Sequence, residues 1–227
     1  MLRKKLYEMI INIEENGFAT KLRRKRFLLF EDMVRKIDKK DKITVLDLGG
    51  TPSYWRQVYD IDKNPLNLGV TLLNINLAVC NESFFEYRRG DARFLHDMEE
   101  NSFDIAFSNS MIEHVGDLTQ QVMAVSEMKR VAKYLYLQTP NFFFPLEPHY
   151  QLFFVHWLPF SLKIKVLSRF YKKSNAYEIY LSDPINLLTK NDLRFLFDPK
   201  KFGIFPEKIF FLTKAFVVIS KIINIHR

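Results

Sequence analysis

Apolar residues recur through the first part of the chain at the spacing of amphipathic helices. This pattern predicts one helix over residues 2–13 and a second over residues 27–37. A charged turn, residues 38–42, follows the second helix. We therefore expect residues 1–42 to form an N-terminal helical cap.

From residue 43 onward, short apolar runs alternate with helical patterns. Such alternation is typical of a parallel β-sheet with helices between its strands. The run at residues 43–48 is apolar on both faces, as a central parallel strand requires. The clearest intervening helix covers residues 118–131. The expected strands are residues 43–48, 69–73, 84–88, 103–107 and 134–138.

After Thr139 the alternation stops, and prolines break the chain into a long loop that is rich in aromatic rings. Residues 160–170 have the pattern of a helix. We therefore expect residues 43–227 to form a single α/β domain that carries an aromatic-rich insert at about residues 140–185.

The last part of the chain predicts one helix and two strands. Thr189 and Asp192 have the spacing of a capping box, which places the start of a helix at residues 192–197. Residues 208–221 have the pattern of two strands around a short turn near residues 213–214. These two strands would complete the sheet.

Composition narrows the class of protein. The chain has 227 residues, of which 48% are hydrophobic and 26% charged, as expected for a folded globular protein. Its single cysteine, Cys80, allows no intrachain disulfide and favours a reducing, cytoplasmic location. We expect no signal peptide, and no run reaches the ~18 to 20 apolar residues of a membrane span.

The formal net charge is +8, and much of the excess lies at residues 3–5 and 21–26. A solvated helix face explains these runs most simply, although a basic surface can also meet nucleic acid, anionic lipid or an acidic substrate. Aromatic residues are not interleaved with the basic run, as a single-strand binding surface would require. We therefore expect no nucleic acid partner, and peripheral membrane contact and the oligomeric state stay open.

The segment Asp47-Leu48-Gly49-Gly50-Thr51 follows the first expected strand. Glycines let a ligand approach the backbone closely, and ligands of open α/β sheets bind just beyond the carboxyl ends of the strands. The acid could hold a cationic group of such a ligand. This segment resembles the first motif of the class I S-adenosylmethionine-dependent methyltransferases, although Thr51 and Ser53 stand where that motif has further glycines.

The resemblance implies a Rossmann-like fold and S-adenosylmethionine as the cofactor. The implied sheet is mostly parallel and seven-stranded, with helices on both faces and one antiparallel strand near the C-terminus. The resemblance is strong over residues 43–150 and looser over residues 186–220.

Further segments resemble other motifs of this family. Asn74 stands where the family has an acid that bonds the ribose hydroxyls, and Asp91 and Ala92 lie in a turn that resembles the adenine-binding turn. Ser108 and Asn109 end a strand like the family's fourth. The cofactor-binding residues implied in this way are Asp47, Gly49, Gly50, Thr51, Asn74, Asp91, Ala92, Ser108 and Asn109.

The loop after the fifth expected strand carries Glu147 and His149, and it looks like a Pro-His element of a bacterial subgroup associated with polysaccharide or small-metabolite pathways. An oxygen or nitrogen acceptor loses a proton during methyl transfer, and the ordinary pKa of histidine, about 6.5, suits that role. His149 is the first candidate for the general base and His114 the second, and Glu147 is expected either to orient His149 or to contact the substrate. The expected reaction is methyl transfer to a hydroxyl, or less readily an amine, of a small molecule or glycan precursor.

Other functions fit the sequence less well. A dinucleotide-dependent dehydrogenase would need glycines where Thr51 and Tyr54 stand. The Asn-Pro-Pro-aromatic run of amino-directed DNA methyltransferases is missing, as is the nucleophilic cysteine of cytosine-C5 enzymes. The sequence has neither zinc-binding spacing nor paired acids after the fourth and fifth strands, so we expect no metal. A binding module without catalysis, for S-adenosylmethionine or a nucleotide, and an RNA-directed methyltransferase remain alternatives.

Overall fold

The structure is a computed structural model, and it describes residues 17–39, 41–76, 82–147, 149, 152–170 and 185–222. The helix expected over residues 2–13 lies outside these residues. The basic run at residues 3–5 and Cys80 also lie outside them.

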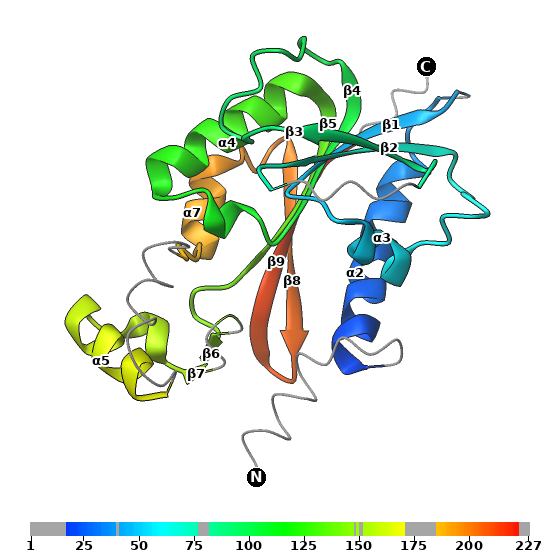
Figure 1. Cartoon of the computed structure of the whole chain (residues 1–227). Helices are drawn as coiled ribbons and strands as arrows, with labels where there is room; N and C mark the ends of the chain where they lie inside the picture. The colour runs from blue at the N-terminus through cyan, green and yellow to red at the C-terminus, as the bar shows by residue number, and fades with distance from the viewer. Residues whose placement is uncertain are drawn as a thin grey trace.

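A seven-stranded sheet with the order β3-β2-β1-β4-β5-β9-β8 forms the centre of the fold (Figure 1). Strands β1 to β5 are parallel, β9 runs antiparallel to β5, and β8 pairs antiparallel with β9. This arrangement confirms the predicted mostly parallel sheet with one antiparallel strand near the C-terminus. The strands are β1 (Ile43–Leu48), β2 (Leu68–Asn74), β3 (Phe85–Arg89), β4 (Phe103–Asn109), β5 (Ala132–Pro140), β8 (Phe202–Ile209) and β9 (Leu212–Ser220).

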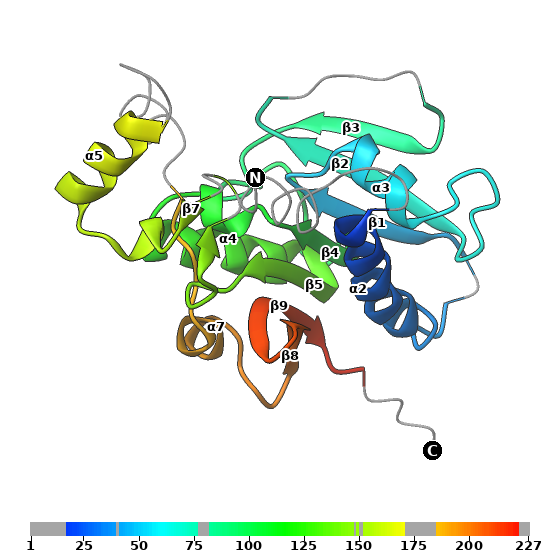
Figure 2. The same ribbon diagram turned by 90° about the horizontal axis from the view of Figure 1, so that it is seen from below.

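Helices cover both faces of this sheet, as predicted (Figures 1 and 2). Successive residues of β1 point to opposite faces, so Val45 belongs to one core cluster and Leu46 to the other. The cluster that contains Val45 lies under α2 (Phe18–Val34) and α3 (Pro52–Val58). The second lies under α4 (Leu118–Val131) and α7 (Lys190–Leu196).

The five parallel strands were predicted to within two residues at each end. The helix predicted over residues 118–131 is α4, and α5 (Phe160–Phe170) also has its predicted bounds. The capping box of Thr189 and Asp192 is present, with Thr189 accepting a hydrogen bond from the Asp192 amide. Helix α7 therefore starts at Lys190, directly after its cap.

Two expected boundaries are wrong. Helix α2 begins at Phe18 and ends at Val34, so it contains the whole basic run at residues 21–26. The C-terminal hairpin starts at Phe202, and its turn lies at residues 210–211 rather than 213–214. Pro206 argues against a strand in the sequence because proline has no backbone N–H to donate. Strand β8 tolerates it because β8 is at the edge of the sheet.

The insert after β5 forms small elements below one end of the sheet (Figure 1). Leu152, Val155 and Leu167 form a separate apolar cluster within it. In the described part of the chain, no helix is long and apolar enough to cross a membrane. The small elements are β6 (Leu146–Glu147), β7 (Leu152–Phe153), η2 (Val155–Trp157) and α5, and a further short helix, η1 (Ile112–His114), follows β4.

We predict that Phe30 is essential to the packing of α2 on the sheet, because its fully buried ring contacts Phe107 and Tyr136 of neighbouring strands. Phe30→Ala should lower the free energy of unfolding by about 3–5 kcal/mol. Leu28→Ala is the control, because Leu28 lies on the same helix and is 55% exposed. It should change the free energy by about 0.5 kcal/mol or less in urea denaturation. Equal losses in the two variants would contradict this packing.

Candidate active site

Two cavities lie at the carboxyl ends of the parallel strands, and Ser110 lines both. The first cavity has a volume of about 680 Å³, and the second about 290 Å³. Residues lining the first cavity include Gly49, Asn74, Asp91, Ala92, Ser110 and His114. Residues lining the second include Arg23, Arg26, Asn109, Ser110, His149 and Lys214.

Two glycines carry the chain from β1 to α3, and Gly49 lines the first cavity whereas the predicted cofactor neighbour Gly50 is buried and does not. Gly49 has a φ of 78°, and a Cβ built on it would lie 2.6 Å from Met111 Cγ. A Cβ on Gly50 would lie 2.4 Å from a carboxylate oxygen of Asp47. Both positions therefore require glycine, and the bare backbone of Gly49 is open to a ligand.

Asp47 does not line either cavity. It is 2% exposed, and its Oδ2 accepts a hydrogen bond of 2.7 Å from Trp55 Nε1. Burial raises the pKa of the Asp47 carboxyl to about 8, and the hydrogen bond from Trp55 opposes part of this rise. The structure thus places Asp47 beneath the glycine loop, where it fixes Trp55 of α3, and not beside the cavity as the sequence suggests.

The structure brings Asn74, Asp91 and Ala92 together in the first cavity, as expected for residues that end neighbouring strands. Both carboxylate oxygens of Asp91 accept hydrogen bonds from Arg93, including one of 2.6 Å from Nη2. These bonds lower the pKa of Asp91, so it is ionised at neutral pH. Arg93 also lines this cavity, and the sequence analysis missed it.

Three other predicted cofactor neighbours lie elsewhere. Thr51 is exposed at the start of α3, with its hydroxyl 3.1 Å from that of Ser53. Ser108 is fully buried and lines neither cavity. Asn109 lines the second cavity rather than the first. The segment that follows β4 instead brings Ser110, Met111 and His114 to the first cavity.

Ser110 has a φ of 53°, in the left-handed region that serine rarely adopts. Gln138 of β5 holds it there, because the Ser110 amide donates to the Gln138 carbonyl and the two side chains are bonded at 2.9 Å. This pairing fixes the wall that the two cavities share.

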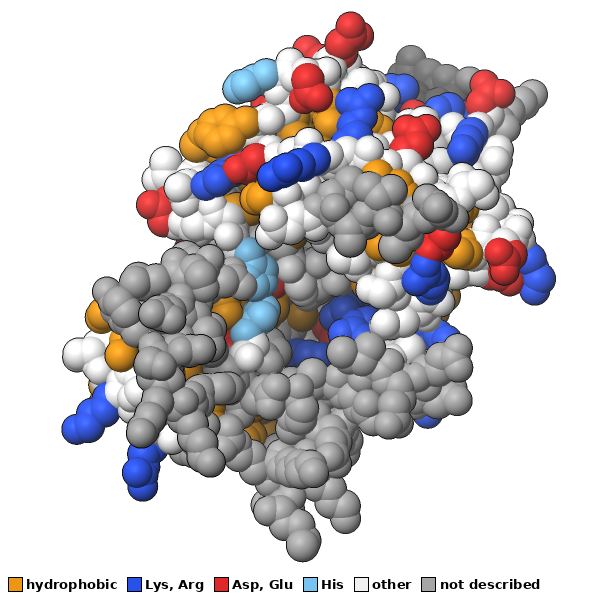
Figure 3. Space-filling view, viewed as in Figure 1, with side chains coloured by type: hydrophobic (Ala, Val, Ile, Leu, Met, Phe, Trp, Pro, Cys, Tyr) orange, Lys and Arg blue, Asp and Glu red, His pale blue; other side chains and the backbone are white. Residues whose placement is uncertain are grey.

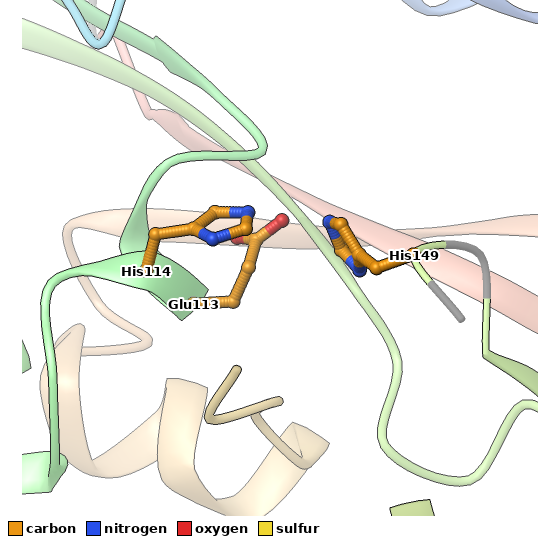
Figure 4. Close-up of side chains that lie close together, drawn as sticks. All are labelled: Glu113, His114 and His149. Atoms are coloured by element: carbon orange, nitrogen blue, oxygen red, sulfur yellow. The ribbon is translucent and has the colours of Figure 1, made fainter. Parts of the chain in front are cut away.

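His114 of η1 and His149 of the insert meet at the boundary between the cavities (Figure 4). Their ring centroids are 4.8 Å apart, and the rings are nearly perpendicular. Nδ1 of His149 lies 2.7 Å from a carboxylate oxygen of Glu147, which is 1% exposed. When the His149 ring is neutral, this contact places the ring proton on Nδ1 and makes Nε2 the nitrogen that can accept a proton.

Glu113 is a second buried acid beside these histidines (Figure 4). Its Oε2 accepts a hydrogen bond from the Thr139 hydroxyl, and burial raises its pKa. Glu113, His114 and His149 each place one potential ligand atom within 4.8 Å of the others. These ligand types bind divalent cations. The expected absence of a metal therefore stays a prediction.

The sequence analysis did not single out three cations of the second cavity, Arg23, Arg26 and Lys214. The basic run at residues 21–26 was interpreted as a solvated helix face, and this is wrong for Arg26. Arg26 is 8% exposed and forms an ion pair of 2.9 Å with Glu207. Nothing local in the sequence marks this burial, because Glu207 belongs to the distant strand β8.

Comparison with known proteins gives a family match over part of the chain. Residues 46–134, from β1 to the start of β5, match the model of a methyltransferase domain family. This segment contains the glycine loop, the Asp91 turn and the end of β4. The chain has no match among curated proteins. The matched segment is thus similar to a methyltransferase domain, and the sheet has the order and direction of the class I methyltransferase fold.

Solved structures have the same fold. The DszA carbon methyltransferase is 17% identical, with a TM-score of 0.55, over 89% of this chain and 53% of that one. The CurJ carbon methyltransferase is 15% identical, with a TM-score of 0.54, over 87% of this chain and 53% of that one. Haemonchus contortus phosphoethanolamine N-methyltransferase 2, solved with S-adenosyl-L-methionine, is 18% identical, with a TM-score of 0.51, over 81% and 38%. The chain thus spans about half the length of the two carbon methyltransferases and a smaller share of the third protein.

We predict that ionisation of Asp47 opposes folding. Its pKa is raised from an ordinary 3.8 to about 8, so the folded protein binds its proton more tightly and stability falls as the pH rises between these values. Asp47→Asn retains an acceptor for Trp55 and removes the ionisation. In urea denaturation, the free energy of unfolding of the variant should rise relative to that of the wild type across this pH range, by a few kcal/mol at most. Above this range the difference should stay constant.

Asp62→Asn is the control for this measurement, because Asp62 is exposed. It should follow the wild type at every pH. A gain for Asp47→Asn that is already complete at about pH 4 would contradict the raised pKa.

Proposed function

We propose that this protein transfers the methyl group of S-adenosylmethionine to a hydroxyl, or less readily an amine, of a small molecule or glycan precursor. One observation carries the proposal: two cavities meet at Ser110, and the paired rings of His114 and His149 lie at their boundary. The first cavity would hold the cofactor and the second the acceptor. The single cysteine further supports a cytoplasmic location.

The residues of the first cavity fit this cofactor. The volume of about 680 Å³ is within the range of small-molecule sites, and the Gly49 backbone permits close approach. The Asn74 side chain would bond ribose hydroxyls, the Asp91 carboxylate would accept from the adenine amine, and the Ala92 amide would donate to an adenine ring nitrogen. When bound, the cofactor supplies an electrophilic methyl group on a sulfonium.

The second cavity would position the acceptor against His149. As the acceptor oxygen took the methyl group and the carbon–sulfur bond broke with its electrons returning to sulfur, the hydroxyl proton would pass to Nε2 of His149. Glu147, whose carboxylate oxygen lies 2.7 Å from Nδ1 of His149, would stabilise the resulting imidazolium. Of the aromatic run at residues 142–144, Phe144 lines this cavity and the other two rings do not.

The acceptor atom follows from the need for a base. The similar structures include carbon and nitrogen methyltransferases, so the fold alone does not favour one atom. A neutral amine can attack the methyl group with its lone pair, whereas a hydroxyl at neutral pH benefits from a base that takes its proton. The Glu147–His149 pair therefore supports a hydroxyl acceptor.

Calorimetry with S-adenosylmethionine and S-adenosylhomocysteine tests the proposal directly. Both should bind at one site per chain. A transfer assay with methyl-labelled cofactor and fractionated cell extract should then place the label in a small, protease-resistant product. Binding without transfer to any fraction would favour the alternative of a non-catalytic module, and label in RNA would favour an RNA-directed enzyme.

We predict that Asp91→Ala weakens the binding of S-adenosylhomocysteine at least about tenfold, because one charge-assisted hydrogen bond is lost. Asp97→Ala is the matched control: this aspartate follows the same turn, and its side chain is 74% exposed. It should bind with wild-type affinity in the same calorimetric titration. Wild-type affinity in Asp91→Ala would remove the adenine assignment.

We predict that His149→Ala leaves the affinity for S-adenosylhomocysteine within about twofold and lowers the transfer rate by about 10²–10⁴-fold. His96→Ala, at an exposed histidine that lines neither cavity, should retain the wild-type rate. If His149 acts as the base and not as a metal ligand, EDTA will leave the wild-type rate unchanged. A loss with EDTA that added zinc reverses would contradict this role.

A further inference from the structure

The second cavity concentrates positive charge. Helix α2 contributes Arg23 and Arg26 to its lining, and β9 contributes Lys214. The side chains of Arg26 and Lys214 are only 9% and 19% exposed. Figure 3 shows basic side chains in a hollow beside the histidines. Cations that are withdrawn from water in this way require anionic partners to be stable.

The described residues supply only one carboxylate to these three cations. Glu207 lies 2.9 Å from Nη1 of Arg26 and 3.9 Å from Nζ of Lys214. Arg23 instead donates a hydrogen bond of 3.0 Å to the neutral side chain of Gln57. Two other acids lie nearby, but Glu147 is held against His149 and Glu113 accepts a hydrogen bond from the Thr139 hydroxyl. Among the described residues, positive charge is therefore in excess at this site.

Two further observations indicate that the excess is not relieved within the described part of the chain. Nε of Arg26 is buried and has no hydrogen-bond partner there. The pKa of Lys214 is lowered to about 8, mainly by burial and further by Arg26 and Arg23. An anion in the cavity would relieve both conditions.

We infer that the acceptor carries a phosphate or carboxylate group, which Arg23, Arg26 and Lys214 bind in the second cavity. Guanidinium groups offer two parallel donors to the oxygens of either anion, and the ammonium of Lys214 adds a contact from strand β9. The inference rests on the proposed function, since it places this anion on the molecule that His149 deprotonates. The bound anion would fix the orientation of the acceptor hydroxyl.

The test compares three sugars that differ in charge: glucose 6-phosphate, glucuronate and glucose. Each is titrated by calorimetry into the protein saturated with S-adenosylhomocysteine, at constant ionic strength. We expect at least one anionic sugar to bind at least about tenfold more tightly than glucose. Tighter binding of glucose 6-phosphate would identify the group as a phosphate, and tighter binding of glucuronate would identify it as a carboxylate. Equal affinities, or no anion binding below about 10 mM, would overturn the inference.

Lys214→Gln should weaken anion binding about tenfold or more, because it removes one charged donor. Lys208→Gln is its matched control, on the same hairpin but exposed and outside the cavity. Arg23→Gln, with Lys25→Gln as its control, provides a second variant if Lys214→Gln folds poorly. Unchanged anion affinity in a folded cavity variant would overturn the inference.

The affinity for S-adenosylhomocysteine separates this inference from the proposed function. It should be the same in wild type, Lys214→Gln and Lys208→Gln. A selective loss in Lys214→Gln would mean that the cations bind the carboxylate of the cofactor, which overturns the acceptor inference and leaves the methyltransferase assignment intact. Failure of the wild type to bind S-adenosylhomocysteine would instead remove the proposed function.

Discussion

The parallel pairing of β1 with both of its neighbours is the constraint on which the site depends. Leu48 is level with Leu73 of β2 and with Ser108 of β4, so the chain leaves all three strands at the same height. The residues that follow therefore surround one space, although they come from segments far apart in the sequence. A shift of register between these strands would separate the glycine loop from Asn74 and Ser110.

The same register separates two electrostatic environments. In the first cavity Asp91 is neutralised by Arg93, whereas the second cavity holds Arg23, Arg26 and Lys214 around Glu207. Ser110 forms the wall between them. A sulfonium cofactor and an anionic acceptor would then each meet surroundings that suit their charge, with two histidines between them.

The sequence predicted β1, β2, β4 and β5 well because each is a short apolar run whose two faces are both buried. Edge strand β8 was predicted less well, since Pro206 and the half-exposed Phe205 break the pattern of a buried strand. The turn at Phe210 has no glycine or asparagine to mark it, although Phe210 adopts a φ of 53°. The hydrophobic pattern of the sequence thus predicts a strand where the residues of that strand are themselves buried.

The site was predicted in part for the same reason. Asn74 and Asp91 follow strand ends directly, so their meeting could be inferred from the order of the strands. The burial of Arg26 against Glu207 joins residues at opposite ends of the chain, and no local pattern records such a pairing. Asp47 occupies the expected motif position, but its partner Trp55 draws it under the loop.

Ser110 has a consequence for what the enzyme can become. Its left-handed backbone strongly disfavours β-branched side chains, and its hydroxyl is bonded to the Gln138 side chain. The backbone conformation at the boundary of the two cavities therefore restricts which side chains can replace Ser110. If the second cavity binds the acceptor, substitutions in its other walls could change the acceptor, while the boundary at Ser110 would stay as it is.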